Sequence, residues 1–233
     1  MLSFVIPAHN EEALIGATLA ALDRAIAAAG EPSEIIVVDD DSADRTAAIA
    51  SAAGARVVQV KLRHIAAARN AGAAVAHGDV LIFVDADTIV PAPTLLEAIR
   101  TLREGVVAGG AQARLDAHAP LWAKVCWLPF QYAGAFLRLP GGAFMFMTRE
   151  AFESAGRFDE QYFAGEEIYF TRTLKRIGPF RVLRHQVITS GRKFRVLGFR
   201  GTMREWTRLA AGGRGVLKTR KRLGFWYGTR REP

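Results

Sequence analysis

Apolar and polar positions alternate in blocks along the first 110 residues. Short apolar runs predict strands, and these are Phe4–Ile6, Ile35–Val38, Arg56–Val60 and Val80–Val84. Longer alanine-rich stretches between and after them predict helices, and these are Glu12–Ala29, Ala43–Ala53, Ile65–His77 and Pro93–Arg103. A regular order of strand and helix predicts an α/β fold with a mostly parallel central sheet and helices on both faces.

The pattern changes after residue 105. We expect a strand at Val106–Gln112, an apolar and aromatic helix at Leu121–Leu139, a glycine-led strand at Gly141–Met147 and a helix at Glu166–Gly178. We divide the chain into one domain of two halves, 1–110 and 111–183, and a basic, aromatic-containing C-terminal segment, 184–233. A hydrophobic content of 50% in 233 residues is enough for the buried core of such a domain.

Charge is distributed very unevenly. The net charge is +8, but residues 184–233 carry 14 Lys and Arg against two Glu, so the preceding residues are net negative. Such asymmetry predicts a partner of opposite charge, which leaves anionic lipid, nucleic acid and an acidic acceptor open, beside a basic surface that is merely solvated.

The remaining composition favours an intracellular protein. Cys126 is single, so no internal disulfide forms, and a reducing compartment is expected. The first apolar run has no basic segment ahead of it and is typical of a strand, not of a signal peptide. No stretch of about 20 residues is apolar enough to span a bilayer. We therefore expect a cytoplasmic location, with a peripheral position on the inner face of the membrane as a further hypothesis.

Polar clusters follow three of the predicted strands. They are Pro7–Glu11, Asp39–Ser42 and Asp85–Asp87, and Ala68–Gly72 lies in the helix between the last two. Each alone is explained as a turn or helix cap, but the carboxyl ends of parallel strands share one edge, where open α/β sheets bind ligands. Two carboxylates one residue apart, Asp85 and Asp87, suit Mg²⁺ or Mn²⁺ and hence a diphosphate.

These clusters resemble the motifs of the inverting family 2 glycosyltransferases of the GT-A fold, in order and spacing, over about the first 180 residues. The matching segments are Val5–Glu12, Glu34–Thr46, Ala68–Gly72, Phe83–Asp87, Gly156–Glu160 and Gly165–Arg172. The resemblance implies a GT-A catalytic domain over 1–183, with a nucleotide-binding half and an acceptor half. It also implies transfer of a UDP- or GDP-linked sugar to a hydroxyl or phosphate acceptor, with inversion and with Mn²⁺ or Mg²⁺.

The resemblance also implies roles for single residues. The residues expected to bind the nucleotide-sugar are Pro7, Ala8, Glu11, Asp40, Arg69 and Asp85, and Asp87 is the expected metal ligand. Asp40 would accept a hydrogen bond from the edge of the base, while the neighbouring Asp39 orders the turn. Arg69 would contact the diphosphate or merely cap a helix.

The catalytic base falls at Glu167, where the family carries an Asp. Glutamate is one methylene longer, which leaves open whether Glu166 or Glu167 removes the proton of the acceptor hydroxyl. Many relatives carry a histidine near Ser190. We expect Arg192, with Lys193, to contact the diphosphate in its place, against a solvated turn as the alternative, and we expect His185 to be structural.

Three other classes of protein compete with this interpretation. A sugar nucleotidyltransferase has a similar sheet but usually begins with a glycine-rich phosphate loop, and a dehydrogenase needs Gly-x-Gly-x-x-Gly; the sequence after the first strand has neither. A noncatalytic membrane- or nucleic-acid-binding protein is suggested only by the basic segment. Because aromatic residues such as Phe199 and Trp226 interleave its charges, we expect contact with an anionic membrane and a lipid-linked acceptor, and no nucleic acid.

Overall fold

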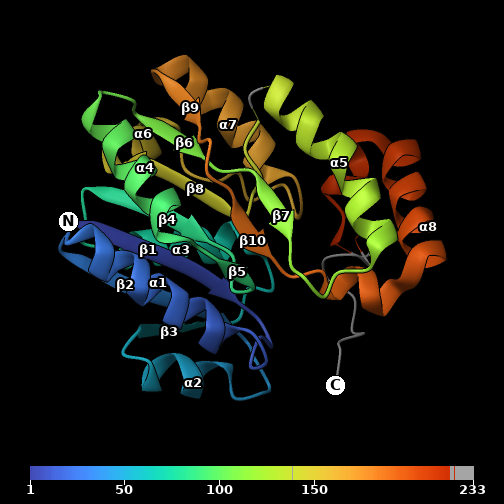
Figure 1. The fold of residues 1–233 in the computed structure, drawn as a ribbon, viewed down its shortest axis with the longest axis horizontal. Helices are drawn as coiled ribbons and strands as arrows, with labels where there is room; N and C mark the ends of the chain where they lie inside the picture. The colour runs from blue at the N-terminus through green and yellow to red at the C-terminus, as the bar shows by residue number, and fades with distance from the viewer. Residues whose placement is uncertain (138, 221–222, 224–233) are drawn as a thin grey trace.

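The computed structural model describes residues 1–137, 139–220 and 223, and it consists of two sheets covered by helices (Figure 1). The main sheet has the strand order β3-β2-β1-β4-β8-β6-β9, and the small sheet has the order β5-β10-β7. The strands are β1 (Leu2–Ala8), β2 (Ser33–Asp40), β3 (Arg56–Val60), β4 (Val80–Val84), β5 (Thr88–Ile89), β6 (Ala108–Gly110), β7 (Ala113–Leu115), β8 (Phe144–Thr148), β9 (Phe180–Val182) and β10 (Val187–Thr189). The helices are α1 (Ile15–Ala29), α2 (Thr46–Ala52), α3 (Ile65–Val75), α4 (Ala92–Arg103), α5 (Leu121–Phe136), α6 (Arg149–Ser154), α7 (Glu166–Ile177) and α8 (Arg192–Leu217).

The first half forms the parallel part of the main sheet. Strands β1 to β4 pair in parallel in the order β3-β2-β1-β4, which confirms the predicted α/β architecture. Neighbouring residues of β1 enter opposite cores, with Phe4 among the side chains on one face of the sheet and Val5 among those on the other. Both are fully buried, so the sheet is covered on both faces as the apolar runs predict.

The second half extends the sheet with mixed pairing. β8 runs antiparallel to β4 and to β6, and β9 lies parallel to β6 at the edge. The strand predicted over Val106–Gln112 is present as β6 but is shorter, because the chain leaves the main sheet at Ala111 and continues as β7 in the small sheet. Ala111 makes this change of direction by donating its N–H to Phe144 and accepting from the N–H of Gly141.

α5 and α8 form a helical layer at one side of the molecule (Figure 1). No helix or strand was predicted in the basic segment from the sequence, yet about half of the segment forms the 26-residue helix α8. Phe194 at its start packs among Trp122, Trp127 and Trp206. Trp226, which we expected to contact membrane, lies outside the described residues. Within the described ranges no helix is both long and apolar enough to cross a bilayer.

Candidate active site

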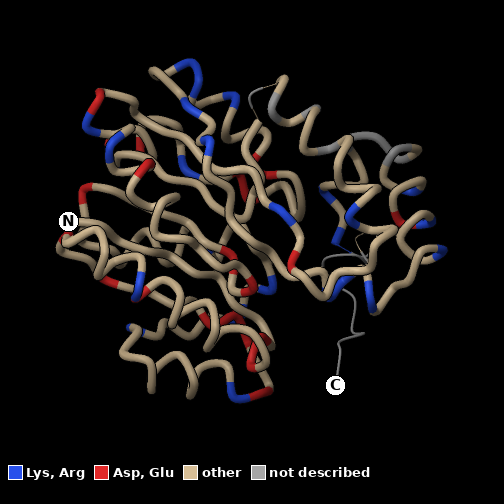
Figure 2. Tube along the Cα trace, viewed as in Figure 1, with Lys and Arg blue, Asp and Glu red and all other residues tan. Residues whose placement is uncertain are grey.

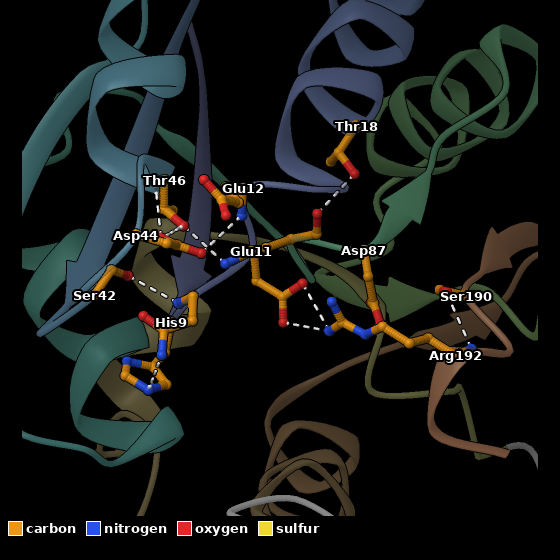
Figure 3. A network of polar contacts seen from close by, with 12 residues as sticks. His9, Glu11, Glu12, Thr18, Ser42, Asp44, Thr46, Asp87, Ser190 and Arg192 are labelled. Atoms are coloured by element: carbon orange, nitrogen blue, oxygen red, sulfur yellow. Dashed lines mark hydrogen bonds and ion pairs between the residues drawn. The ribbon is translucent and has the colours of Figure 1, made fainter. Parts of the chain in front are cut away.

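Hydrogen bonds join the loops that follow β1 and β2. β1 ends at Pro7 and Ala8, and the loop follows directly. In this loop the N–H of Asn10 donates to Ser42 Oγ at 2.9 Å, and the N–H of Glu11 donates to Thr46 Oγ1 at 2.7 Å. Figure 3 shows these contacts, with the Glu11 side chain turned away from them toward Asp87 and Arg192. The polar clusters expected to share one edge of the sheet therefore lie side by side.

Asp40, and not Asp39, orders the loop after β3. Its Oδ1 accepts the N–H groups of Leu62 and Arg63, both at 2.7 Å, and its Oδ2 accepts that of His64 at 2.9 Å. Asp39 is 4% exposed, and its Oδ1 has no hydrogen-bond partner within the described structure. Asp40 thus holds this loop with its carboxylate, and its expected contact with the base edge stays a prediction. A carboxylate has about four acceptor positions, so Asp40 keeps capacity for one further donor.

Arg69, near the start of α3, lies at the centre of a buried cluster of charges. Its side chain is only 2% exposed and donates to Asp85 Oδ1 at 2.8 Å, Glu166 Oε1 at 2.5 Å and the carbonyl of Gly142 at 3.0 Å. Burial opposes the charged guanidinium, but Asp85 and Glu166 outweigh it and raise the pKa of Arg69. The guanidinium thereby joins the end of β4 to the start of α7. Its Nε is buried and has no hydrogen-bond partner within the described structure, so the guanidinium keeps a donor beyond these three contacts.

Asp87 lies beside a second pair of charges (Figure 3). Arg192 Nη2 donates to both carboxylate oxygens of Glu11, at 2.7 and 2.8 Å, across 181 positions of sequence. Burial raises the pKa of Asp87 to about 6; Lys193 opposes this shift, while Glu11 and Asp85 add to it. The structure therefore brings Arg192 and Lys193 to the same edge as the acidic pair.

Glu166 and Glu167 begin α7 in different surroundings. Glu166 is 3% exposed and held by Arg69, whereas Glu167 lies against Gly142, where a Cβ would be 3.1 Å from its carboxyl carbon. Burial, followed by the charge of Glu166, raises the pKa of Glu167 to about 8. Burial also raises the pKa of Glu166, against the effect of Arg69. At neutral pH the pair therefore holds a proton, and Glu167 is the member next to the glycine turn.

His185 contacts Glu97 of α4, with Nδ1 2.8 Å from Oε2. Glu97 is buried and also accepts the backbone N–H groups of Arg184 and His185. The imidazole thus helps to fix the loop before β10, in keeping with the structural role expected of it.

The acidic edge fits a divalent cation. Burial is the main cause of the raised pKa of Asp87, and the negative charges of Glu11 and Asp85 add to it, so a divalent cation at this carboxylate would meet further negative charge. Among the described residues no three His, Cys, Asp or Glu side chains are grouped as a complete metal site. Mg²⁺ commonly takes one or two protein carboxylates and completes its shell with substrate phosphates and water. One or two carboxylates of this edge could hold a cation only together with phosphate oxygens and water.

Two contacts at this edge have no counterpart in the sequence analysis. The guanidinium of Arg63 contacts the ring of His9, and Asn70 both donates to and accepts from the backbone of Phe158. Asn70 belongs to the segment Ala68–Gly72, which the sequence motif already marked as functional. Arg63 lies in a loop without periodic pattern, at a φ of 50°, and no local signal marks it.

Comparison with known proteins identifies the family of the chain and relatives that match it over part of their length. Residues 3–153, about two thirds of the chain, match glycosyl transferase family 2. The undecaprenyl-phosphate 4-deoxy-4-formamido-L-arabinose transferase of Pseudomonas aeruginosa is 35% identical over 114 residues, covering 45% of this chain and 33% of that protein. The glucosyl-3-phosphoglycerate synthase of Mycolicibacterium paratuberculosis is 36% identical over 100 residues, covering 40% and 30%. The chain thus spans about a third of the length of these curated relatives.

Solved structures share the architecture. S. aureus TarS in complex with UDP-GlcNAc superposes with a TM-score of 0.64 at 18% identity, covering 81% of this chain and 58% of TarS. Glucosyl-3-phosphoglycerate synthase from Mycobacterium tuberculosis, in complex with Mg²⁺ and UDP, gives a TM-score of 0.59 at 25% identity, covering 82% and 69%. These likenesses confirm the GT-A type of fold, and the match over residues 3–153 shows that the chain belongs to glycosyl transferase family 2.

Proposed function

We propose that the protein transfers a sugar from a nucleoside-diphosphate sugar to a hydroxyl or phosphate acceptor, with inversion at the anomeric carbon and with Mn²⁺ or Mg²⁺ bound. The buried cluster around Arg69 carries this proposal, since it joins Asp85 at the end of β4 to Glu166 at the start of α7. One edge of the sheet thus offers carboxylates for a metal-bound diphosphate and, beside them, a carboxyl group for general-base chemistry. Family membership supports the same assignment, as does the Mg²⁺ and UDP complex of glucosyl-3-phosphoglycerate synthase.

On the donor side, the ends of β1 and β2 line the nucleoside pocket. The residues we assign to the donor are Pro7, Ala8, Glu11, Asp40, Arg69, Asp85 and Arg192. Asp87 would hold the cation, which when bound would neutralise negative charge on the departing diphosphate. Arg192 and Lys193 add positive charge at this otherwise acidic edge.

On the acceptor side, Glu167 is the general base. The acceptor oxygen attacks the anomeric carbon from the face opposite the diphosphate, its proton passes to the Glu167 carboxylate, and the bond from that carbon to the diphosphate oxygen breaks. The electron pair of that bond leaves with the nucleoside diphosphate. A single displacement of this kind inverts the anomeric centre and needs no covalent nucleophile. Glu166 already accepts a hydrogen bond from Arg69, and its role is to pair with this buried guanidinium.

For the acceptor we propose a lipid-linked molecule. The Pseudomonas relative is named as an undecaprenyl-phosphate transferase, and undecaprenyl phosphate is a lipid-linked phosphate. The charge of residues 184–233 supports contact with an anionic membrane, which for a cytoplasmic enzyme is the inner face. Nucleic acid would draw on the same charges but leaves the acidic edge unexplained.

Calorimetric titration with UDP, GDP and NADH, each with and without Mn²⁺, tests the donor class. We expect Mn²⁺-dependent binding of one nucleoside diphosphate and no binding of NADH. Asp87→Ala should abolish the Mn²⁺-dependent part, because it removes a ligand oxygen and little core volume. The control is Asp79→Ala, an exposed carboxylate just before the other end of β4.

Unchanged Mn²⁺-dependent affinity in a folded Asp87→Ala protein would overturn the metal assignment. Binding of NADH alone would overturn the transferase itself. A further titration with UTP covers the remaining alternative, because preference for a nucleoside triphosphate would favour a sugar nucleotidyltransferase instead.

A further inference from the structure

α5 carries a continuous apolar stripe that faces solvent. Its members follow one another at intervals of 4, 3, 4 and 4 residues, which places them on one face of the helix. They are Leu121, Val125, Leu128, Tyr132 and Phe136, and their exposed fractions run from 46% to 87%. Phe199 of α8, 51% exposed, lies beside them through its ring contact with Trp122 at 5.4 Å. A contiguous apolar surface of this kind indicates an interaction site.

The opposite face of α5 is already fixed to the protein. Trp127 Nε1 and Gln131 Nε2 both donate to the carbonyl of Ala113, each at 2.8 Å. Trp122 and Trp127 also make edge-on ring contacts with Phe194. The helix therefore cannot turn its stripe inward without losing these hydrogen bonds and ring contacts.

Positive charge flanks the stripe. The sequence of α5 contains no acidic residue, and that of α8 contains seven Lys and Arg and a single acidic residue, Glu205. Glu205 is 6% exposed and accepts from Arg208 at 3.1 Å, whereas Arg200 and Arg204 are exposed. Figure 2 shows Lys and Arg recurring along α8, which Figure 1 places beside α5.

We propose that this docking face, the apolar stripe of α5 together with Phe199 and the exposed arginines of α8, seats the protein on an anionic lipid bilayer. α5 would lie in the plane of the interface with its stripe among the acyl chains, and the arginines would contact the headgroups. A helix of 16 residues that contains Lys124 is suited to lie on a bilayer and not to cross it.

A second copy of the chain fits this surface less well. Association of two docking faces would bring two sets of arginines together, and neither α5 nor α8 offers an exposed acidic residue to pair with them. An anionic bilayer supplies both an apolar interior and opposite charge.

The docking face is connected to the catalytic edge. α8 begins at Arg192, which pairs with Glu11, and the same helix carries Phe199, Arg200 and Arg204 of the docking face. This part of the inference rests on the proposed function, since it implies that the acceptor is presented from the lipid surface. Binding to the bilayer itself needs neither donor nor acceptor.

Flotation of the full chain with vesicles tests the docking face. We expect flotation with vesicles of phosphatidylcholine and phosphatidylglycerol, little with phosphatidylcholine alone, and weaker binding in high salt. Val125→Asp/Leu128→Asp should lower partitioning at least about tenfold, because it places two charges in the apolar stripe. Arg200→Gln/Arg204→Gln should lower it on anionic vesicles.

Matched controls come from the face that carries α1 and α4. Leu96→Asp changes an exposed leucine of α4, 44% exposed, and Arg24→Gln changes an exposed arginine of α1. Both should float as the unchanged protein does. Calorimetry with UDP and Mn²⁺ on the same variants separates the two proposals, since docking variants should keep nucleotide affinity.

Three results would overturn the docking face. The first is a chain that stays at the bottom with both kinds of vesicle. The second is a stripe variant that floats as well as the unchanged protein. The third is a dimer, seen by light scattering, that the stripe variant dissociates while flotation is unaffected, because the stripe would then be an interface between copies. The arginine variant keeps the test decisive if the stripe variant does not fold.

Discussion

Glu166 and Glu167 adjoin in sequence but differ in their neighbours. Glu166 takes the hydrogen bond from Arg69, and Glu167 then has to ionise next to a negative charge, which contributes to its pKa of about 8. A carboxylate with a raised pKa is a stronger proton acceptor once ionised, which suits a general base. The absence of a side chain at Gly142 leaves room for the Glu167 carboxyl group, which a Cβ there would approach to 3.1 Å.

Glu167→Gln should lower turnover by about 10² or more and leave donor affinity nearly unchanged. In the unchanged protein kcat/KM should rise with pH toward a plateau above about 8, as Glu167 loses its proton. Because the folded pKa lies above the ordinary 4.5, the folded state holds the extra proton between these values, and stability falls as pH rises through this window. The Tm of Glu167→Gln relative to the unchanged protein should therefore increase from pH 5 to pH 9.

Glu166→Gln is the comparison for this variant. It should lower the Tm, because it leaves the buried Arg69 with one carboxylate partner fewer. If instead Glu166→Gln is inactive and Glu167→Gln is active, the base is the other glutamate.

At the scale of elements, α3 packs unusually close to the strands beneath it. A Cβ at Gly72 would lie 2.4 Å from Val5 Cγ1 and 2.8 Å from Val38 Cγ2, so only glycine allows this approach. The same helix carries Arg69, whose reach to Asp85 depends on where the helix lies over the sheet. Gly72 thus allows the helix position from which Arg69 reaches Asp85.

Gly72→Ala should destabilise the fold by about 1–3 kcal/mol, because the new methyl group overlaps two buried valines. Gly16→Ala in α1 is the matched control, since its nearest atom would be Ile49 Cγ2 at an ordinary 3.5 Å. That substitution should be neutral or stabilise by up to about 1 kcal/mol. Urea unfolding measures both, and equal free energies of unfolding for the two variants would contradict the close-packing argument.

Across the whole molecule, α8 connects both sides of the site. Arg192 at its start pairs with Glu11 after β1, and the carbonyl of Leu217 at its end accepts the N–H of Phe163, shortly before α7, at 2.8 Å. The helix is part of the basic segment, and Glu11 belongs to the acidic remainder of the chain. The uneven charge of the sequence therefore appears as attraction between parts of one molecule, in addition to its proposed role at a bilayer.

A double-mutant cycle of Glu11→Gln and Arg192→Gln should give a coupling free energy of about 1–3 kcal/mol, because both side chains are largely buried. The neighbouring exposed pair Glu12 and Arg45, at 3.2 Å, is the control and should couple by less than about 1 kcal/mol. Urea unfolding of the two sets gives both values. Equal couplings would mean that α8 is not held to the donor edge by this pair.

The sequence by itself determined the local elements and the edge where the polar clusters meet. The alternation of apolar runs and alanine-rich stretches predicted β1 to β4 and α1 to α4, because helix and strand formation depends on residues near one another in the chain. The order of these elements then implied parallel pairing, and parallel pairing brings the segments after Pro7, Asp39 and Val84 to one edge.

Only the tertiary structure decided which side chains meet across long stretches of chain. The contact of Arg69 with Glu166 and that of Arg192 with Glu11 span 97 and 181 positions, and no local pattern encodes either. The same holds for the exposed stripe of α5: its sequence shows that the helix is apolar, but the hydrogen bonds of Trp127 and Gln131 to Ala113 fix which face is buried. A helix that is apolar on more than one side can pack in several orientations, and the partner that it packs against selects one of them.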